Sequence, residues 1–441
     1  MRVVVVALGK VGLPLAARIA LAGHEVVGSD IDPRVVELVN AGQAPFPNEA
    51  GLAEALAETV ADGRLRAVGD TAAAVSGGAD VVIAVPPLLV DTAARPDWTA
   101  LDAVVDDIGR GLERGTVVSI ETTVPVGTTR NRVAPALAAR SGLTSEVDFH
   151  TIFSPERVFS GRAIADLDAY PKLVGGLSPE GEERGCELYA SFLEAEVRGL
   201  GSAEAAELTK LAETTYRDIN IAFANELARY ADRLRVDVLS VIDAANSQPY
   251  SHVHRPGIAV GGHCIPVYPR FLLAGDPDAR LPRAAREVNE AMPAYAADLL
   301  GDIAERRVLI LGVAYRGGVK ETAFSGAFPL RDALRARGAE VVVHDPLYAD
   351  AELAALGFDP WDGGAIDAAV VQADHPEYAT LRESDLPGVM AVVDGRGVIN
   401  AAAFDVPVHR IGRPDDTSAD AGSPLAPDVL RLDERPPAGG G

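Results

Sequence analysis

The stretch RVVVVALGKVGLPLAARIALAGHEVVGSD, residues 2–30, decides the fold. Its β-branched start ends in a glycine turn, a segment with helical spacing follows, and the strand-like EVVGSD ends at Asp30. Strand, glycine turn, helix and second strand, in this order, begin a doubly wound sheet. Asp32 and Pro33 come next and predict a helix N-cap followed by proline in the first turn.

The same plan continues along the chain and then recurs. Strands and helices alternate to about residue 200, and a long helix is predicted over about 203–235. After a second helical stretch, VLILGVAYR (308–316), a helical segment and EVVVHDP repeat the opening. The sequence therefore predicts an α/β protein with two Rossmann-like doubly wound domains joined by a central helical connector. The other predicted elements are strands at 80–86, 116–123 and 148–156, a helix at about 282–305, and a loop at 246–270 rich in proline, glycine and histidine.

Charge and composition exclude several classes of protein. The 441 residues carry a net charge of −24, whereas nucleic acids and anionic membranes are bound by basic faces. The chain has no run of about 18 apolar residues and no signal-peptide pattern at its start. Its two cysteines cannot form a disulfide framework, which indicates a reducing compartment. We expect a cytoplasmic protein that binds neither nucleic acid nor membrane.

The first glycine turn reads Ala7-Leu-Gly9-Lys-Val-Gly12 and differs from the dinucleotide fingerprint G-x-G-x-x-G at its first position. Gly9 still allows close approach of a pyrophosphate, and Gly12 still allows tight packing of helix on strand. Asp30, about twenty residues further on, is placed to bind ribose hydroxyls and to repel a 2′-phosphate. The pattern favours NAD over NADP. A glycine turn that binds no dinucleotide is the alternative.

The loop GIAVGGHCIP, residues 257–266, contains Cys264. Two glycines and a histidine precede the cysteine, so the loop exposes backbone N–H groups and leaves room for a ligand, as a nucleophile requires. His263 is equally well explained by a structural role. No second histidine stands at metal-ligand spacing, so we predict no metal site. Cys186, in a helix-like segment, is predicted to be an ordinary core residue.

Lysine is rare in this chain, and Lys210 lies in a helical segment that can carry chemistry. Arginine keeps its proton in the working pH range, whereas a buried lysine can release one, so the scarcity of lysine favours a functional role for Lys210. Thr214 follows at i+4 on the same helical face. A surface ion pair between Glu207 and Lys210 is the alternative. The only lysines are Lys10, Lys172, Lys210 and Lys320.

Taken together, five segments resemble the UDP-glucose/GDP-mannose dehydrogenase family over about residues 1–410. The motif GGHCIPV resembles that of the branch that acts on UDP-N-acetylhexosamines, such as the UDP-N-acetyl-D-mannosamine 6-dehydrogenases. The segments are ETTVPVGTT (121–129), FSPERV (153–158), ELTKLAETTYRDINIAFANELA (207–228), VGGHCIPV (260–267) and VLILGVAYR (308–316).

This resemblance implies an oxidation of the C6 alcohol of a UDP-hexose to a carboxylate, with two NAD molecules reduced. Cys264 would capture the C6 aldehyde, Lys210 would stabilise the oxyanion, and Glu156 would activate the water that hydrolyses the thioester. Thr123 would position water or cofactor, and Thr214 and Tyr268 would complete the reacting groups. The other implied cofactor residues are Gly9, Lys10, Val11, Gly12, Asp30, Arg34, Pro86 and Lys320, and the other implied substrate residues are Arg157, Arg255, Gly261, Tyr315, Arg316 and Arg396.

The resemblance also implies a division of the chain and a homodimer formed by the central helices. Residues 413–441 are rich in Pro, Gly, Asp and Ser and are predicted to be a disordered tail. The expected segments are an NAD-binding domain at 1–202, a helical dimerisation domain with the cysteine loop at 203–305, and a UDP-sugar-binding domain at 306–412.

Four positions depart from the family pattern. Ala7 replaces the first fingerprint glycine, and Thr214 and Tyr268 replace an asparagine and an aspartate of the reacting shell. Ala323 stands where an arginine usually reaches the cofactor, and Lys320 is expected to supply that charge. Three alternatives therefore stay open: a two-electron dehydrogenase that stops at the aldehyde, an enzyme with UDP-glucose as substrate, and an inactive nucleotide-sugar-binding protein.

Overall fold

The computed structural model describes residues 1–413 except 48, 92, 159 and 160. The chain forms two compact units, each built on a parallel sheet, and helix α9 runs from the first unit into the second. Residues 414–441, where we predict a disordered tail, lie outside the described residues. The first unit is Met1–Thr214 with Val267–Asp278, the second is Thr215–Pro266 with the chain from Ala279 onward, and α9 is Ala203–Leu234.

The sheet of the first unit has eight strands in the order β10-β9-β8-β7-β4-β1-β2-β3. All neighbours are parallel except β8 and β9. The order reverses beside β1, which lies between β2 and β4, and ligands of such sheets bind at this point. The strands are β1 (Arg2–Val6), β2 (Glu25–Ser29), β3 (Leu65–Val68), β4 (Val81–Ala84), β7 (Val117–Ile120), β8 (His150–Phe153), β9 (Lys172–Gly176) and β10 (Val197–Gly199).

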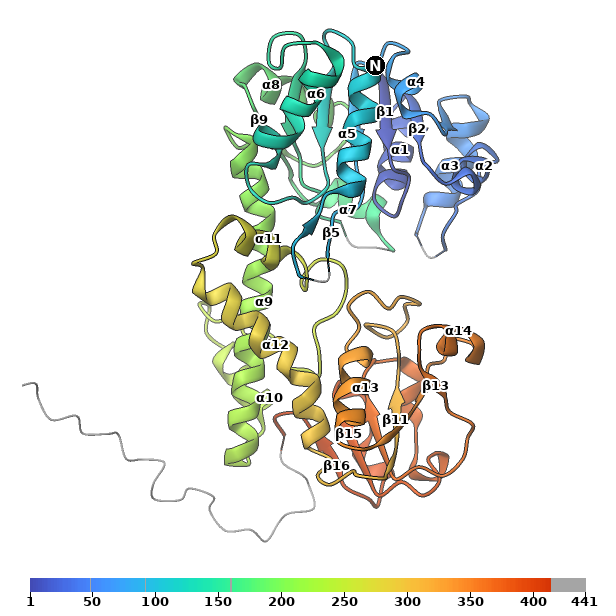
Figure 1. Cartoon of the computed structure of the whole chain (residues 1–441), viewed down its shortest axis with the longest axis vertical. Helices are drawn as coiled ribbons and strands as arrows, with labels where there is room; N and C mark the ends of the chain where they lie inside the picture. Colours follow the sequence, from blue (N-terminus) through green and yellow to red (C-terminus); the bar gives the residue numbers. More distant parts are fainter. Residues whose placement is uncertain (48, 92, 159–160, 414–441) are drawn as a thin grey trace, which may run out of the picture. The chain divides into compact units, whose positions relative to one another are not determined.

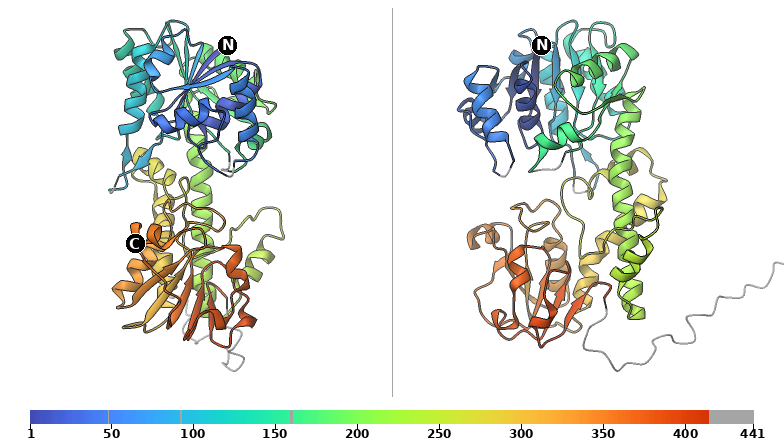
Figure 2. Two further views of the ribbon diagram at one scale, coloured as in Figure 1. Left: turned by 90° about the vertical axis from the view of Figure 1, so that its right-hand side faces the viewer. Right: turned by 180° about the vertical axis from the view of Figure 1, so that it is seen from behind.

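Helices cover both faces of this sheet (Figures 1 and 2). Val3 and Val5 of β1 pack with α1, α3 and α8 on one face, whereas Val4 and Val6 pack with α5 and α6 on the other. Both faces are buried, which explains the unbroken valine run of the opening strand. The helices are α1 (Gly12–Leu21), α2 (Pro33–Asn40), α3 (Leu52–Ala61), α4 (Thr71–Val75), α5 (Thr99–Gly111), η1 (Thr129–Val133), α6 (Ala134–Ser141), α7 (Ala163–Ala169) and α8 (Pro179–Ala190), and a hairpin joins β5 (Leu89–Val90) to β6 (Pro96–Asp97).

The second unit repeats the plan with a six-stranded parallel sheet in the order β13-β12-β11-β14-β15-β16. One face packs against α9, α12, α13 and α14, and the other against the short helices η2 to η4. The strands are β11 (Arg307–Leu311), β12 (Glu340–His344), β13 (Asp359–Pro360), β14 (Ala368–Val371), β15 (Ala391–Asp394) and β16 (Val408–Arg410). The helices are α10 (Val238–Ala245), α12 (Arg280–Asp298), α13 (Ala327–Ala336), α14 (Asp350–Ala355), η2 (Pro376–Thr380), η3 (Glu383–Asp385) and η4 (Ala401–Ala403).

The predicted fold class is confirmed, and two predicted element boundaries are wrong. The second central helix ends at Asp298 rather than near 305, because Gly301 adopts φ 71° and its N–H bonds back to Asp298. The predicted loop 246–270 ends early, since α11 (Tyr268–Gly275) begins inside it with Pro269 in its first turn. Among the described residues, no helix combines the length and apolarity that a membrane span needs.

Candidate functional site

The glycine turn after β1 is built for a close-lying ligand. A Cβ on Gly12 would lie 2.0 Å from the carbonyl oxygen of Ala7, so only glycine fits there. A Cβ on Gly9 would meet no heavy atom within 4 Å, so this side of the turn is open. Ala7 itself adopts φ 73°, the left-handed region that explains why a glycine is usual at this position.

The residues around the turn fit a dinucleotide such as NAD. Asp30 follows β2, and its Oδ2 accepts the Leu8 N–H at 2.7 Å while its Oδ1 accepts the Asp32 N–H at 2.9 Å. A carboxylate has about four acceptor positions, so capacity remains for ribose hydroxyls. Val11 precedes α1 and has no polar atom to cap the helix. Lys10 and Arg34 are exposed close to the turn in sequence, and Pro86 follows β4 on the other side of the switch point.

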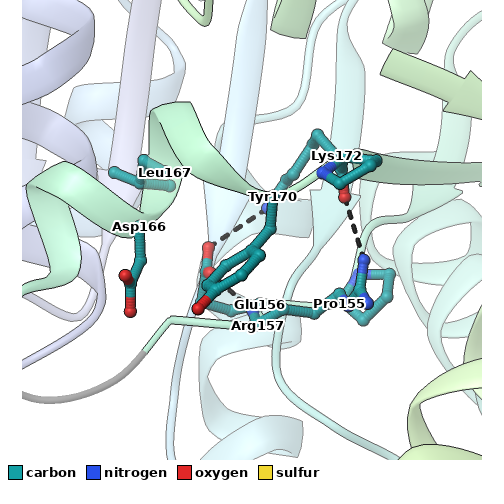
Figure 3. A pocket seen from close by; sticks show the side chains of 8 residues that line it. Pro155, Glu156, Arg157, Asp166, Leu167, Tyr170 and Lys172 are labelled. Carbon is teal, nitrogen blue, oxygen red and sulfur yellow. Dashed lines mark hydrogen bonds and ion pairs between the residues drawn. The ribbon is translucent and has the colours of Figure 1, made fainter. Parts of the chain in front are cut away.

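Glu156 lies in a buried, polar setting just after β8 (Figure 3). Its Oε1 accepts the N–H groups of Arg157 at 2.5 Å and Val158 at 2.9 Å, and its Oε2 accepts from Lys172 Nζ at 3.2 Å. Burial acts to raise the pKa of Glu156, but the Lys172 ammonium and these N–H groups outweigh it and hold the pKa below its usual value. A cavity of about 10 Å³, room for about one water, adjoins it.

Lys210 contacts the backbone of Glu156 in the same unit, and Tyr268 lies near Lys210. Lys210 Nζ donates to the backbone oxygen of Glu156 at 2.5 Å and lies 6.0 Å from the ring centroid of Tyr268. Thr214 is buried, and its hydroxyl donates to the Lys210 carbonyl at 3.0 Å. Thr123 is buried in the segment after β7. The segment after β8, α9 and the start of α11 therefore bring a carboxylate, an ammonium and a phenol into one region of the first unit.

Glu207 bonds Gly127 and Thr129, whereas the alternative interpretation paired it with Lys210 on the surface. It is fully buried, and its carboxylate accepts the N–H groups of Gly127 at 2.5 Å and Thr129 at 2.9 Å, together with the Thr129 hydroxyl at 2.7 Å. Lys210 is buried as well. A surface ion pair between Glu207 and Lys210 is therefore wrong, because neither side chain is on the surface.

Sequence reasoning missed two ionisable groups next to Glu156. Lys172 is 5% exposed and donates to Glu121 Oε2 at 2.9 Å as well as to Glu156. Glu121 is fully buried and also accepts from the Tyr189 hydroxyl at 2.5 Å. The scarcity of lysine that drew attention to Lys210 applied equally to Lys172, which stands in a strand buried along its whole length.

In the second unit, the loop that carries Cys264 is attached to the segment after β11. The Gly262 N–H donates to the Ala323 oxygen at 2.8 Å, and His263 forms an ion pair with Glu321. A Cβ on Gly261 would lie 2.7 Å from Cβ of Tyr315, so glycine is needed for this approach. Cys264 is exposed, as a nucleophile must be.

Tyr315, Arg316 and Arg396 form one cluster at the carboxyl ends of β11 and β15. Arg316 Nε donates to the Tyr315 hydroxyl at 2.9 Å, and Arg396 donates to the carbonyls of Gln372 at 2.7 Å and Tyr315 at 3.2 Å. Burial lowers the pKa of Arg396, opposed by Asp374, and arginine still keeps its charge. The cluster supplies two guanidinium groups of the kind that hold phosphates bidentately.

Arg255 and Lys320, also implied by the resemblance, have ionic partners outside this cluster. Arg255 is exposed, and its nearest recorded acid is Asp243 at 3.7 Å. Lys320 donates to both oxygens of Glu352 at 2.6 and 2.8 Å, so its charge is already matched by a carboxylate. In the first unit, Arg157 binds Glu213 and the Pro171 oxygen.

Cys186 behaves as an ordinary packing residue. It is half-buried against the core around α1 and α8, and burial raises the pKa of its thiol. The prediction for this residue is therefore confirmed. Throughout the described part of the chain, no three His, Cys, Asp or Glu side chains are grouped to hold a metal ion.

Comparison with known proteins finds similarity over most of the chain. Three models of the UDP-glucose/GDP-mannose dehydrogenase family match: the NAD-binding domain at residues 1–193, the central domain at 204–291 and the UDP-binding domain at 309–401. A UDP-N-acetyl-D-mannosamine dehydrogenase of Pyrococcus horikoshii is 36% identical over 94% of this chain and 100% of the relative. An NDP-N-acetyl-D-galactosaminuronic acid dehydrogenase of Ralstonia solanacearum is 34% identical over 90% of this chain and 96% of that relative. A solved structure of the UDP-D-ManNAc dehydrogenase from Pyrococcus horikoshii superposes with a TM-score of 0.84 at 34% identity. The superposition covers 94% of this chain and 99% of that structure's chain.

Proposed function

The chain belongs to the UDP-glucose/GDP-mannose dehydrogenase family and is an NAD-dependent nucleotide-sugar dehydrogenase; we propose that it oxidises C6 of a UDP-N-acetylhexosamine fully to the carboxylate. The observation that carries this proposal is the setting of Glu156, a largely buried carboxylate that accepts from Lys172 and two backbone N–H groups, while Lys210 donates to the backbone oxygen of the same residue. Both kinds of dehydrogenase need an acceptor for the alcohol proton, but only full oxidation also needs a base that activates water for hydrolysis.

In the proposed mechanism, Cys264 provides the covalent bond that links the two oxidations. The C6 alcohol first loses a hydride, and its hydroxyl proton passes to water, which gives the aldehyde. The sulfur of Cys264 attacks this aldehyde, and the resulting thiohemiacetal loses a second hydride and a second hydroxyl proton to become a thioester. NAD, when bound, accepts the hydride in each oxidation. Lys210 stabilises the negative charge that develops on the C6 oxygen. Glu156 takes a proton from water as the water attacks the thioester, the C–S bond breaks, and the acid is released.

Thr123, Thr214 and Tyr268 support these steps in the proposal. Thr123 positions water or cofactor. The Thr214 hydroxyl donates a hydrogen bond to the Lys210 carbonyl. In the proposal it therefore acts by stabilising the turn of the helix that carries the ammonium. Tyr268 brings a phenol where the family has a carboxylate, and a phenol can donate a hydrogen bond to an oxyanion.

The substrate class rests on relatives and on the second unit. The two relatives compared above are named for N-acetylhexosamine or N-acetylhexosaminuronic acid nucleotides. In this proposal Arg316 and Arg396 hold the phosphates, with Tyr315 beside them, because both guanidinium groups lie at the carboxyl ends of parallel strands. Arg255 and Gly261 flank the same ligand.

We also propose that the protein is a homodimer formed through α9. Tyr216, Phe223 and Tyr230 recur at seven-residue spacing on this helix and are 56%, 49% and 44% exposed. Large apolar side chains aligned on one helical face favour burial against a second helix. Light scattering of the full chain should give twice the mass of one chain. The Phe223→Glu variant should give the mass of a single chain.

One experiment tests the function. Purified protein is mixed with NAD and a panel of UDP-sugars, NADH is counted per sugar consumed, and the product is identified by mass. Two NADH and a carboxylate from a UDP-N-acetylhexosamine are expected. One NADH with an aldehyde would establish the two-electron alternative, preference for UDP-glucose would overturn the substrate class, and binding without NADH would indicate an inactive binding protein.

A further inference from the structure

Lys172 joins two carboxylates in a buried ionic cluster that also includes Glu121 and Glu156. The ammonium donates to Glu121 at 2.9 Å and to Glu156 at 3.2 Å, and all three side chains are at most 11% exposed. Figure 3 shows Lys172 and Glu156 among the side chains that line the small cavity, with their interaction drawn as a dashed line. Tyr189 closes the cluster, with its hydroxyl 2.5 Å from Glu121 and 2.8 Å from Ser119.

The cluster holds one cation for two acids, so the two carboxylates compete for it. Burial is the largest influence on Glu121 and raises its pKa to about 7, against the attraction of Lys172. For Glu156 the same burial is outweighed by Lys172, by two backbone N–H groups and by Lys210, and its pKa is lowered. Two backbone N–H groups donate to the carboxylate of Glu156, and Lys210 lies at its backbone oxygen, whereas Glu121 accepts only from Lys172 and the Tyr189 hydroxyl among the described residues. Glu121 is therefore the carboxylate whose negative charge is less well supported and the one that takes up a proton first.

We propose that Lys172 and Glu121 are positioning residues for thioester hydrolysis: Lys172 orients Glu156 and keeps it ionised, and Glu121 is the carboxylate that accepts the cluster's proton in its place. This inference rests on the proposed function of Glu156 as the base. In the step concerned, water adds to the thioester carbon, its proton passes to Glu156, and the C–S bond breaks to return the Cys264 thiolate. Neither Lys172 nor Glu121 needs to touch substrate.

The charged and titratable groups that face the cluster come from five elements. They all act on Glu156 directly or through Lys172, so their sum sets the pH at which the base becomes available. These groups are Glu121 after β7, Glu156 and Arg157 after β8, Lys172 on β9, Tyr189 on α8, and Lys210 with Glu213 on α9.

A purely structural role for the cluster makes a different prediction from a positioning role. A buried ion cluster that only supports the fold would, on substitution, lower stability and slow every step of the reaction together. A positioning role would slow hydrolysis alone and shift its pH dependence. The two oxidations precede hydrolysis, so their NADH can be measured separately in a rapid-mixing experiment.

The test uses the full chain with Lys172→Met, Lys172→Arg and Glu121→Gln. In Lys172→Met we expect a burst of two NADH per subunit, acyl adduct on Cys264 detected by mass, and hydrolysis slowed by about 100-fold. The acidic limb of the pH profile for hydrolysis should move to higher pH in this variant, because Glu156 loses the Lys172 ammonium that lowers its pKa. Lys172→Arg should recover much of the rate. Arg198→Met, which removes an exposed cation on the adjacent strand β10, is the matched control.

Glu121→Gln should leave the acidic limb of the hydrolysis profile unchanged, because Glu121 already carries a proton at the pH where Glu156 titrates. A shifted limb in this variant would overturn the role assigned to Glu121. This variant decides the matter if Lys172→Met fails to fold and shows no burst. An unshifted acidic limb in Lys172→Met protein that still forms the adduct would overturn the positioning role and leave the proposed function standing. Absence of any Cys264 adduct in the wild-type protein under single-turnover conditions would overturn both.

Discussion

The N–H of Leu8 donates a hydrogen bond to Oδ2 of Asp30 over 2.7 Å, and this bond ties the glycine turn to the end of β2. The second unit repeats the arrangement, because Asp345 follows β12 and accepts the N–H of Val313 at 2.8 Å in the turn after β11. In both units the acid at the end of the second strand holds the turn after the first strand. Asp30 therefore has a structural role as well as its predicted contact with ribose.

Asp30→Ala should lower the preference for NAD over NADP by about tenfold in kcat/KM, since the charge that repels a 2′-phosphate is gone. It should also destabilise the fold by about 1 kcal/mol through the lost bond to Leu8. Asp80→Ala removes a similar bond, 2.7 Å from the Arg2 N–H at the start of β1, and should leave the ratio unchanged. Equal kcat/KM for both cofactors in the wild-type enzyme would contradict the assigned role.

Ala7→Gly should stabilise the protein by about 1 kcal/mol, because alanine at φ 73° is strained and glycine is not. Chemical unfolding measures the difference. Ala22→Gly is the matched control. Ala22 caps the C-terminal end of α1 at φ −76°, an unstrained angle for alanine, so no increase in stability is expected. A loss of stability in Ala7→Gly would show that the turn is held by packing and not limited by backbone strain.

Cys264→Ala should abolish formation of the acid while UDP-sugar binding, measured by calorimetry, changes little. The thiol forms a covalent bond in the proposed reaction and contributes little to ground-state binding. Cys186→Ala, the other cysteine, should retain activity because it is a packing residue. Acid production by Cys264→Ala at the wild-type rate would refute the thioester.

Tyr268→Phe should slow oxidation by about tenfold while still releasing two NADH per sugar, since it removes one hydrogen-bond donor and keeps the ring near Lys210. Tyr250→Phe, at a side chain that is 92% exposed, serves as control. One NADH with a stalled thioester in the variant would mean that the phenol takes part in hydrolysis, as the family's carboxylate would.

Glu121→Gln should alter the pH dependence of stability. The pKa of Glu121 is about 7 in the folded protein against an ordinary 4.5, so the folded state keeps a proton that the unfolded chain releases. The stability that this group contributes is present below about pH 4.5 and is lost as the pH rises through about 7. The advantage of wild type over variant in unfolding free energy should therefore shrink between pH 5 and pH 8. The surface change Glu54→Gln is the control, and an advantage that grows with pH would contradict the assignment.

Much of the fold follows from local patterns in the chain. The valine run, the glycine turn and Asp30 predict the opening of a doubly wound sheet, and the structure has it. The long helix predicted at about 203–235 is α9. The ends of α11 and α12 were harder to predict, because they depend on Pro269 and on the left-handed Gly301, which act over one or two residues.

The family, the glycine turn and the candidate reacting residues Cys264, Lys210 and Glu156 can be recognised without a structure, because each stands in a contiguous motif. That Lys172 bridges Glu156, 16 positions away, and Glu121, 51 positions away, becomes visible only in the folded chain. Those contacts depend on β7, β8 and β9 lying side by side and on the burial that their packing creates. Burial sets how strongly each charge acts on its neighbours, and no short stretch of sequence carries that information.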